Sequence, residues 1–184
     1  KQLFLVNPSN YPSAVATARA SGADDVLSSA VICHSLEEAL VGTHLVIGAS
    51  ARQRNIKWKQ LDVIDTCGEI QASIRKSNQE VAVVFGTENS GLTNEELDLC
   101  SILMTIPGNP EYFSLNVASA IQVFAYQNIR HDIGRCRGSY ICARLRIEAL
   151  DKAYGRSQLR LFQAGLAHKL RVVSYAEQID MVSN

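Results

Sequence analysis

The stretch that decides the fold is Val81–Asn128, VAVVFGTENSGLTNEELDLCSILMTIPGNPEYFSLNVASAIQVFAYQN. The run VAVVF at 81–85 is apolar without alternation, which is typical of a strand buried on both faces. Residues 93–96, TNEE, have the form of a capping box and predict the start of a short helix. The elements predicted in this stretch are a strand at 81–85, a glycine loop at 86–91, a helix ending near Cys100, a strand at 102–106, a polar loop at 107–116 and a long helix from Leu115 to about Arg130.

Two loops, Gly86–Gly91 and Pro107–Asn116, each follow one of these predicted strands. We expect the two strands to be neighbours in the sheet, so that both loops lie at the same edge. Open α/β sheets hold their ligands at the carboxyl ends of the strands. The chemistry of the protein is therefore expected in these two loops.

Upstream of this stretch, strands and helices also alternate. KQLFLV predicts a strand that stops at Asn7-Pro8, and HLVIG at 44–48 predicts another. Helices are predicted at 12–21, from Ser35 to near Gly42, and around 68–76. This alternation predicts an α/β fold with a mostly parallel sheet and helices on both faces.

The 184 residues suit one domain, or one domain with an appendage. Residues 1–129 carry 8 Lys/Arg against 13 Asp/Glu, and residues 130–184 carry 10 against 5. We therefore expect a catalytic or binding domain at 1–130 and a basic, mostly helical extension at 131–184. The extension is either an electrostatic contact surface for nucleic acid or a solvated appendage with exposed arginines.

Several classes of protein are disfavoured by the composition. No apolar run approaches the ~20 residues needed to span a bilayer, and Lys1-Gln2 leads into LFLV without the layout of a signal peptide. The five cysteines form no CxxC pair, and the four histidines show no ligand spacing. We expect a cytoplasmic protein with no membrane segment, no metal site and no disulfide framework.

The glycine loop follows a strand and precedes a helix, as phosphate-binding loops do, but it does not match their sequences. Gly91 is followed by Leu92-Thr93 rather than Lys-Ser/Thr, and GxGxxG is absent. The carboxylate of Glu88 would repel phosphate. The loop favours a neutral or cationic ligand, or else it is a plain turn between a strand and a helix.

Other polar residues are open to two interpretations. Ser114 is expected to cap the long helix, and the Asn116 amide either bonds locally or reaches into a site. Arg52 and Arg54 follow the strand at 44–48 and either meet an anion or face solvent. A Cys100 thiol at a helix end is expected in the core rather than as a nucleophile.

Taken together, FGTENSGLTNEEL and IPGNPEYFSLNVASAIQVFAYQ resemble the second and third motifs of the SpoU/TrmH branch of the SPOUT methyltransferases. NPEYxSLNVA and GLTNEELxxC are most similar to the TrmJ-type tRNA ribose methyltransferases. LFLVNP, LEEAL and LVIGASAR match the same group, so the resemblance covers residues 2–130 and none of 131–184.

The resemblance implies a SPOUT fold with a deep C-terminal trefoil knot, in which S-adenosylmethionine is held by three loops. Carried over by position, the catalytic site residues are Glu88, Ser114 and Asn116. The implied cofactor-binding residues are Ala49, Ser50, Gly86, Glu88, Gly91, Ile106, Pro107, Ser114, Leu115 and Asn116.

The implied reaction is methyl transfer to a ribose 2′-hydroxyl of tRNA, in a nucleotide of the anticodon loop. The implied assembly is a homodimer, and Arg52 and Arg54 are candidate RNA contacts. In the family, a first motif with Asn, Gly and the activating Arg precedes the strand that corresponds to LFLV. This sequence begins just after that place, and Arg19 lies too late to substitute. We therefore expect either an N-terminally shortened chain or a protein without the usual base.

Two other functions remain open from the sequence. One is a knotted protein that binds RNA or senses the cofactor without catalysis. The other is an ordinary nucleotide-binding α/β domain, although the failed phosphate templates disfavour it.

Overall fold

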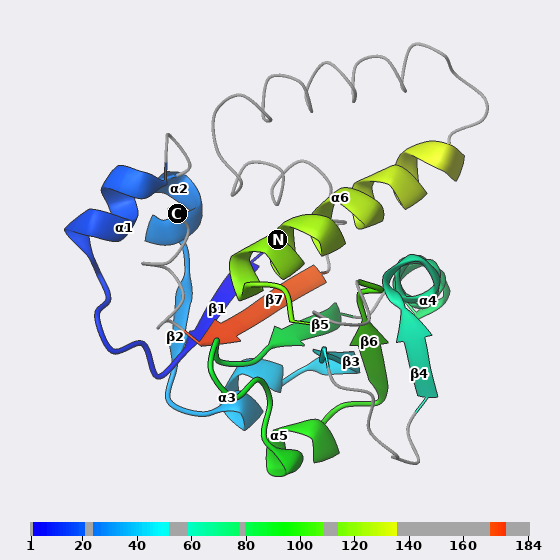
Figure 1. The fold of residues 1–184 in the computed structure, drawn as a ribbon, viewed down its shortest axis with the longest axis horizontal. Helices are drawn as coiled ribbons and strands as arrows, with labels where there is room; N and C mark the ends of the chain where they lie inside the picture. Colours follow the sequence, from blue (N-terminus) through cyan, green and yellow to red (C-terminus); the bar gives the residue numbers. More distant parts are fainter. Residues whose placement is uncertain are drawn as a thin grey trace.

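The computed structural model describes residues 2–20, 24–51, 59–77, 80–108, 114–135 and 170–175. Within these ranges seven strands form one sheet, in the order β2-β1-β7-β5-β3-β6-β4 (Figure 1). Every neighbouring pair is parallel, which confirms the predicted parallel α/β sheet. The strands are β1 (Gln2–Val6), β2 (Val31–Cys33), β3 (Thr43–Ala49), β4 (Lys59–Asp62), β5 (Glu80–Phe85), β6 (Ile102–Thr105) and β7 (Leu170–Tyr175).

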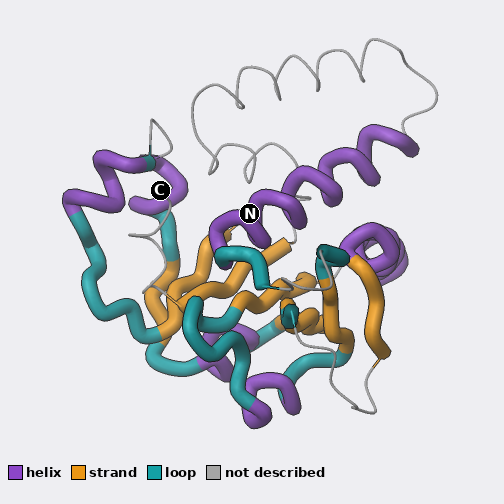
Figure 2. The backbone as a smooth tube through the Cα atoms, in the orientation of Figure 1, coloured by secondary structure: helices purple, strands orange, loops and turns teal. Residues whose placement is uncertain are grey.

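Helices cover both faces of the sheet (Figures 1 and 2). Four of them, α1, α2, α4 and α6, pack into one buried cluster with one face of the sheet. The short helices α3 and α5 pack into a second cluster on the opposite face. The helices are α1 (Ala14–Arg19), α2 (Asp24–Ser28), α3 (Leu36–Leu40), α4 (Val63–Ser77), α5 (Asn94–Asp98) and α6 (Val117–Arg135).

Strand β5 is the buried strand that its sequence predicts, since Val81 to Phe85 are all buried. Val81, Val83 and Phe85 face the α6 side, while Ala82 and Val84 face the α3 and α5 side. The ring of Phe85 packs against that of Phe124 on α6, with centroids 6.0 Å apart. This contact places α6 across the end of β5, next to the glycine loop.

The prediction that the strands before the two loops are neighbours is wrong, because β3 lies between β5 and β6. Ala49 at the end of β3 pairs with Phe85 on one side and Met104 on the other. Burial predicts that a strand is internal, but it carries no information about which strand lies beside it. The two loops therefore share an edge of the sheet with residues 49–51 between them.

The predicted boundary at residue 130 does not hold for β7. This strand belongs to the residues assigned to the basic extension, yet it pairs with β1 on one side and β5 on the other. Leu170, Val172 and Val173 are buried at mid-sheet. A six-residue strand within a polar, basic region is only weakly predicted by its own sequence. Its position in the sheet depends on pairing with β1 and β5, which are distant in the sequence. The helices predicted at 141–170 lie almost entirely outside the described residues.

Elsewhere, the local sequence signals predicted the type of element correctly, but its first and last residues less accurately. Ser13 caps α1 by accepting a hydrogen bond from the Ala16 N–H, so this helix is shorter than the predicted 12–21. Helix α4 is longer than the predicted 68–76. Strands β2 and β4 were not predicted, because one is only three residues long and the other is polar and partly exposed.

Candidate functional site

The glycine loop, residues 86–91, is closed by its own hydrogen bonds. The Gly91 N–H donates to the Thr87 carbonyl at 2.9 Å, and the Thr87 N–H donates to the Gly91 carbonyl at 3.2 Å. The hydroxyls of Thr87 and Ser90 lie 2.7 Å apart across the turn. These hydrogen bonds hold the loop as a compact turn.

Both glycines of this loop are required by geometry. A Cβ on Gly86 would lie 2.1 Å from the Gly91 carbonyl carbon and 2.3 Å from the Leu92 nitrogen, which no side chain can accommodate. Gly91 has φ of +69°, in the left-handed region that favours glycine, and nothing lies within 4 Å of its Cβ position. The two ends of the loop therefore lie against each other at Gly86.

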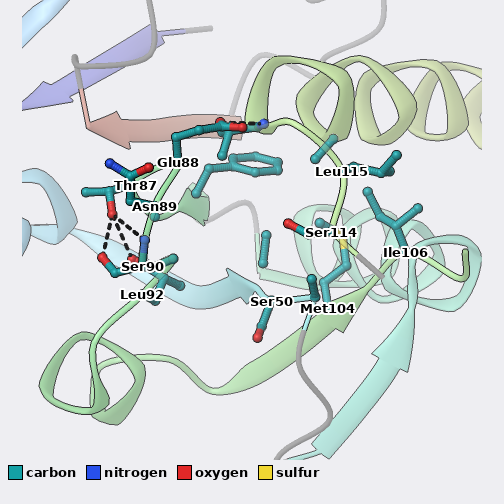
Figure 3. A pocket seen from close by; sticks show the side chains of 17 residues that line it. Ser50, Thr87, Glu88, Asn89, Ser90, Leu92, Met104, Ile106, Ser114 and Leu115 are labelled. Carbon is teal, nitrogen blue, oxygen red and sulfur yellow. Dashed lines mark hydrogen bonds between the residues drawn. The ribbon is translucent and has the colours of Figure 1, made fainter. Parts of the chain in front are cut away.

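The first turn of α6 is closed by two side chains. Glu88 accepts from the Val117 N–H at 2.9 Å (Figure 3), and Asn116 Oδ1 accepts from Ala118 N at 2.9 Å and Ser119 N at 3.4 Å. The Asn116 carbonyl accepts from Ala120 N at 2.9 Å. Three of the N–H groups that a helix start leaves without helical partners, those of Val117, Ala118 and Ser119, are thus satisfied. A carboxylate there also interacts favourably with the helix dipole.

This arrangement corrects the expectation for the helix start. Asn116, rather than Ser114, is the residue whose side chain caps α6. Its side-chain oxygen is engaged locally and does not line the cavity described below. Ser114 is exposed and lines that cavity instead.

A cavity of about 130 Å³ lies at the carboxyl ends of β5, β3 and β6 (Figure 3). Residues 49–51 and 85–92 contribute to its wall, together with the end of β6 and the start of α6. Its described lining residues are Ala49, Ser50, Ala51, Phe85, Gly86, Thr87, Glu88, Asn89, Ser90, Gly91, Leu92, Met104, Ile106, Ser114, Leu115, Val117 and Ala120. Strands distant in sequence therefore meet at one site, as expected for this fold class.

Most of the sequence-predicted cofactor residues line this cavity. They are Ala49, Ser50, Gly86, Glu88, Gly91, Ile106, Ser114 and Leu115. Pro107 and Asn116 do not, and Arg52 and Arg54 lie outside the described residues. Whether the lining residues hold a cofactor stays a prediction.

Nine lining residues were not among the predicted site residues. Four of them are next to predicted residues in the sequence: Ala51, Thr87, Asn89 and Ser90. The other five are Phe85, Leu92, Met104, Val117 and Ala120. Phe85 and Met104 lie at the carboxyl ends of two strands that the sequence predicted. Their position at strand ends could have identified them as lining residues. Val117 and Ala120 are one helical turn apart on α6 and share a face. From sequence alone, an apolar pair at that spacing predicts residues of the hydrophobic core. Neither residue was therefore proposed to line a site.

The charge of the described lining residues disfavours a phosphate site in this cavity. Glu88 is the one charged side chain among the described lining residues, and it is an acid. The remaining groups are small, apolar or neutral hydroxyls, amides and backbone. Such a surface suits a neutral or cationic ligand, because no cation is present among these residues to balance an anion.

Cys100 is not a nucleophile of this site. Burial, and secondarily the charge of Glu96, raises the pKa of the Cys100 thiol to about 12. Since the thiolate is the reactive form, this thiol is inert near neutral pH. Its sulfur instead lies under the Gly48 backbone, where a Cβ would be 2.9 Å from it. The expectation of a core cysteine is confirmed.

Searches for other kinds of site were limited to the described residues. Among them, no three His, Cys, Asp or Glu side chains are grouped so as to hold a metal ion. No described helix is both long and apolar enough to cross a membrane.

The model of the SpoU rRNA Methylase family matches residues 1–126. The chain is also 48% identical, over 126 residues, to the tRNA (cytidine/uridine/adenosine-2'-O-)-methyltransferase TrmJ of Pseudomonas aeruginosa (strain UCBPP-PA14). That alignment covers 68% of this chain and 49% of the relative. The chain thus spans about half the length of the curated relatives it matches.

Two solved structures share the fold. TrmJ from Z. mobilis ZM4 superposes with a TM-score of 0.61 at 25% identity, covering 69% of this chain and 67% of that one. A probable methylase family protein from Haemophilus influenzae Rd KW20 gives a TM-score of 0.63 at 22% identity, over 98% of this chain and 91% of that one. The second likeness is evidence for the fold alone.

Proposed function

The chain belongs to the SpoU rRNA methylase family, and from that membership we propose that the full-length protein transfers a methyl group from S-adenosylmethionine to a ribose 2′-hydroxyl of tRNA. The 48% identity to a TrmJ enzyme supports tRNA as the substrate class. By the same resemblance, the methylated nucleotide would lie in the anticodon loop.

The observation that carries this proposal is the cavity at the three strand ends. Its walls come from the loops that the resemblance assigns to the cofactor, and its described lining contains one carboxylate and no cation. S-Adenosylmethionine supplies a methyl group on a positively charged sulfur. A surface of small residues, neutral polar groups and one acid suits that charge, whereas it would not hold a nucleotide triphosphate.

The size of the cavity indicates how much of the ligand it holds. Pockets for small ligands measure roughly 300–1,000 Å³, against about 130 Å³ here. The described walls therefore fit one part of the cofactor rather than the whole. The segment 109–113, which joins two residues of the wall along the chain, lies outside the described residues.

The three candidate catalytic residues would have different roles. Glu88 would hold the glycine loop against the start of α6, because its carboxylate already accepts from the Val117 N–H. Ser114, exposed on the cavity wall, would orient the ribose hydroxyl with its own hydroxyl. Asn116 would set the direction of the chain at Ser114 and offer its amide to the substrate. Positioning of this kind contributes much of the rate in a direct methyl transfer.

The ribose hydroxyl is a poor nucleophile and needs a proton acceptor. In the family that the chain resembles, the acceptor is an arginine of the first motif, and activity is to be tested on the full-length protein. Arg52, Arg54 and the basic residues beyond 130 would contact tRNA phosphates. Such contacts position a nucleic acid without reading its sequence.

Three further features are proposed on family membership. The chain would form the deep trefoil knot, act as a homodimer and work in the cytoplasm, where tRNA is found. Analytical ultracentrifugation of the full-length protein tests the dimer, and its experimental structure tests the knot.

The direct test is incubation of the full-length protein with tRNA and labelled S-adenosylmethionine, followed by mapping of the labelled nucleotide. We expect label on a ribose 2′-oxygen. Calorimetry with S-adenosylmethionine alone measures cofactor binding separately. Absence of binding and of transfer would contradict the proposal, and label on a base rather than a ribose would contradict the reaction type.

The role of Asn116 can be separated from its role as a cap. Asn116→Asp keeps an oxygen that caps α6 but removes the amide, whereas Asn116→Ala removes both. If the amide serves the substrate, both variants lose most methyl transfer, while only Asn116→Ala loses stability, by about 1 kcal/mol. Parental transfer rates in Asn116→Asp would show that Asn116 acts only as a helix cap.

A further inference from the structure

The last residue of β7, Tyr175, lies at the same edge of the sheet as the cavity. Strand β7 is parallel to β5, and Ser174 pairs with Phe85, so Tyr175 comes level with the start of the glycine loop. Arg171, two pairs of residues earlier on the same face, contacts the end of α3 through the Ala39 and Val41 carbonyls. Tyr175 likewise faces α3 and α5, since side chains alternate along a strand.

The hydroxyl of Tyr175 donates a hydrogen bond to Oε1 of Glu96 on α5. The other oxygen of that carboxylate, Oε2, accepts from the Thr93 backbone N–H at 2.7 Å. Glu96 thus has one oxygen on β7 and the other on the residue where the chain leaves the glycine loop and enters α5. The side chain of Glu96 therefore connects β7 to Thr93, the residue at which the chain leaves the glycine loop (the loop exit).

The tyrosine is held in its donor form. Burial, followed by the hydrogen bond to Glu96 and the nearby charges of Glu96 and Glu37, raises the pKa of Tyr175 well above its usual value. The hydroxyl therefore remains protonated through the physiological range. A phenol donating to a carboxylate makes one of the stronger classes of hydrogen bond.

The loop exit is in turn coupled to the cavity wall. Leu92, which precedes Thr93, is buried and lines the cavity. Its backbone nitrogen lies against Gly86, where a Cβ would be only 2.3 Å away, and its side chain packs over Gly48. A displacement of Leu92 and Thr93 must therefore move Gly86 or open the contact between the two ends of the loop.

We infer that Tyr175 is a positioning residue for the glycine loop, acting through Glu96 on the backbone of Thr93 and Leu92. The strand contributed by the end of the chain thereby sets the shape of the ligand cavity. The effect on ligand binding rests on the proposed function, whereas the effect on the loop does not. Tyr175 itself does not line the cavity and is not expected to touch the ligand.

The test replaces only the hydroxyl, as Tyr175→Phe in the full-length protein. Hydrogen exchange of the backbone amides between residues 87 and 96 is measured without ligand, and we expect it to rise roughly tenfold, the effect of losing a hydrogen bond to a charged group. In methyl transfer assays, KM for S-adenosylmethionine should rise about fivefold with kcat nearly unchanged. A role in stability alone would leave this KM unaltered.

Tyr11→Phe is the matched control. Tyr11 is also partly buried, and its hydroxyl also donates one hydrogen bond, to the Leu27 carbonyl, but on the opposite face of the sheet. We expect this variant to lose a comparable amount of stability without any change at 87–96 or in KM. If both tyrosine variants change the loop equally, the effect is general and the inference fails.

Substitutions of Glu96 test the role of Tyr175 independently. Glu96→Gln keeps an acceptor for the Thr93 N–H and a polar partner for Tyr175, so it should resemble the parent. Glu96→Ala should mimic Tyr175→Phe or exceed it, and the double variant should be no worse than Glu96→Ala, because both act on one link. Additive effects in the double variant would overturn the inference.

The two proposals fail in different ways. If the parent protein binds no S-adenosylmethionine, the proposed function is contradicted, while the exchange experiment still decides the role of Tyr175. If the parent binds the cofactor and Tyr175→Phe leaves both exchange and KM at parental values, the inference is contradicted and the proposed function stands.

Discussion

Helices α5 and α6 both follow loops that line the cavity, but their first turns are stabilised from different distances. In α5, Thr93 and Glu96 bond reciprocally: the Glu96 N–H donates to the Thr93 hydroxyl at 3.2 Å, and the Thr93 N–H donates to Glu96 at 2.7 Å. In α6, the first N–H is capped by Glu88, which lies 29 residues upstream on another loop. The start of α5 is closed by its own residues alone, whereas the start of α6 combines the local cap of Asn116 with a contact from a distant loop.

The difference shows how the cavity is built. A local cap stabilises a helix wherever that helix lies, so it cannot bring two loops together. A remote cap stabilises the helix only when the two segments are already in contact, and it therefore fixes their relative position. The Glu88 contact joins the glycine loop to the polar loop, and the cavity lies between them.

The largest effect is expected from displacing the loop that carries Glu88. In Gly86→Ala the new Cβ would meet backbone atoms at 2.1–2.4 Å. Because backbone cannot yield as a side chain can, we expect a loss of about 3 kcal/mol or more in the free energy of unfolding. We also expect undetectable cofactor binding, measured by denaturant titration and calorimetry.

Gly91→Asn is the control for that variant. Its Cβ position is open, and asparagine tolerates the left-handed backbone better than other residues, so the loss should stay below about 1 kcal/mol. If Gly86→Ala proved as mild as Gly91→Asn, the contact between the ends of the loop would not be essential.

A second remote contact is made by Arg171 of β7. Its guanidinium donates to Glu80 and to the carbonyls of α3, and it lies 4.9 Å from the Phe4 ring centroid. Arg171→Met should lower the free energy of unfolding by about 2 kcal/mol, less than for a fully buried pair because the Glu80 side chain is 42% exposed. Denaturant titration of the parent and the variant measures this loss in the free energy of unfolding.

The matched surface pair is Lys59 with Glu69, whose side chains are 53% and 43% exposed. Lys59→Met should change the free energy of unfolding by less than about 0.5 kcal/mol. Equal losses in the two variants would mean that the carbonyl and ring contacts of Arg171 contribute nothing.

The third prediction compares a remote cap with a local one directly. Glu88→Ala and Ser13→Ala should each lower the free energy of unfolding by about 1 kcal/mol, the usual effect of losing a helix cap. Only Glu88→Ala should also weaken S-adenosylmethionine binding, because Ser13 caps α1, away from the cavity. Equal affinity in both variants would show that Glu88 is a cap and nothing more.

The smallest effect concerns pH and the local cap of α5. Hydrogen bonds to its own backbone N–H and to the Thr93 side chain lower the pKa of Glu95 below its usual value of 4.5. A carboxyl whose pKa is lowered on folding stabilises the protein above 4.5, and this contribution disappears as pH falls through the folded-state pKa.

Hydrogen exchange in α5 should therefore rise slightly as the pH falls below 4.5, beyond the intrinsic change. Glu95→Gln should remove that rise, while the first turn of α6 stays unaffected. A rise of the same size in Glu95→Gln would assign it to another group.

Prediction from sequence succeeded where a feature depends on neighbouring residues. The capping box at 93–96 and the buried run at 81–85 appear in the structure as predicted. Asn116 was the harder case. A capping role and a role in the site need the same residue type at the same position, and the bonds to Ala118 and Ser119 decide only that it caps.

Chain-local chemistry was thus sufficient for the alternation of strands and helices and for the family. Lateral order in the sheet was settled only by tertiary contacts: β3 between β5 and β6, and β7 between β1 and β5. So were the cap that Glu88 places on α6 and the link from Tyr175 to Glu96. The physical reason is range, since propensities and caps act over a few residues, whereas strand pairing and remote capping join groups that become neighbours only after the chain has folded.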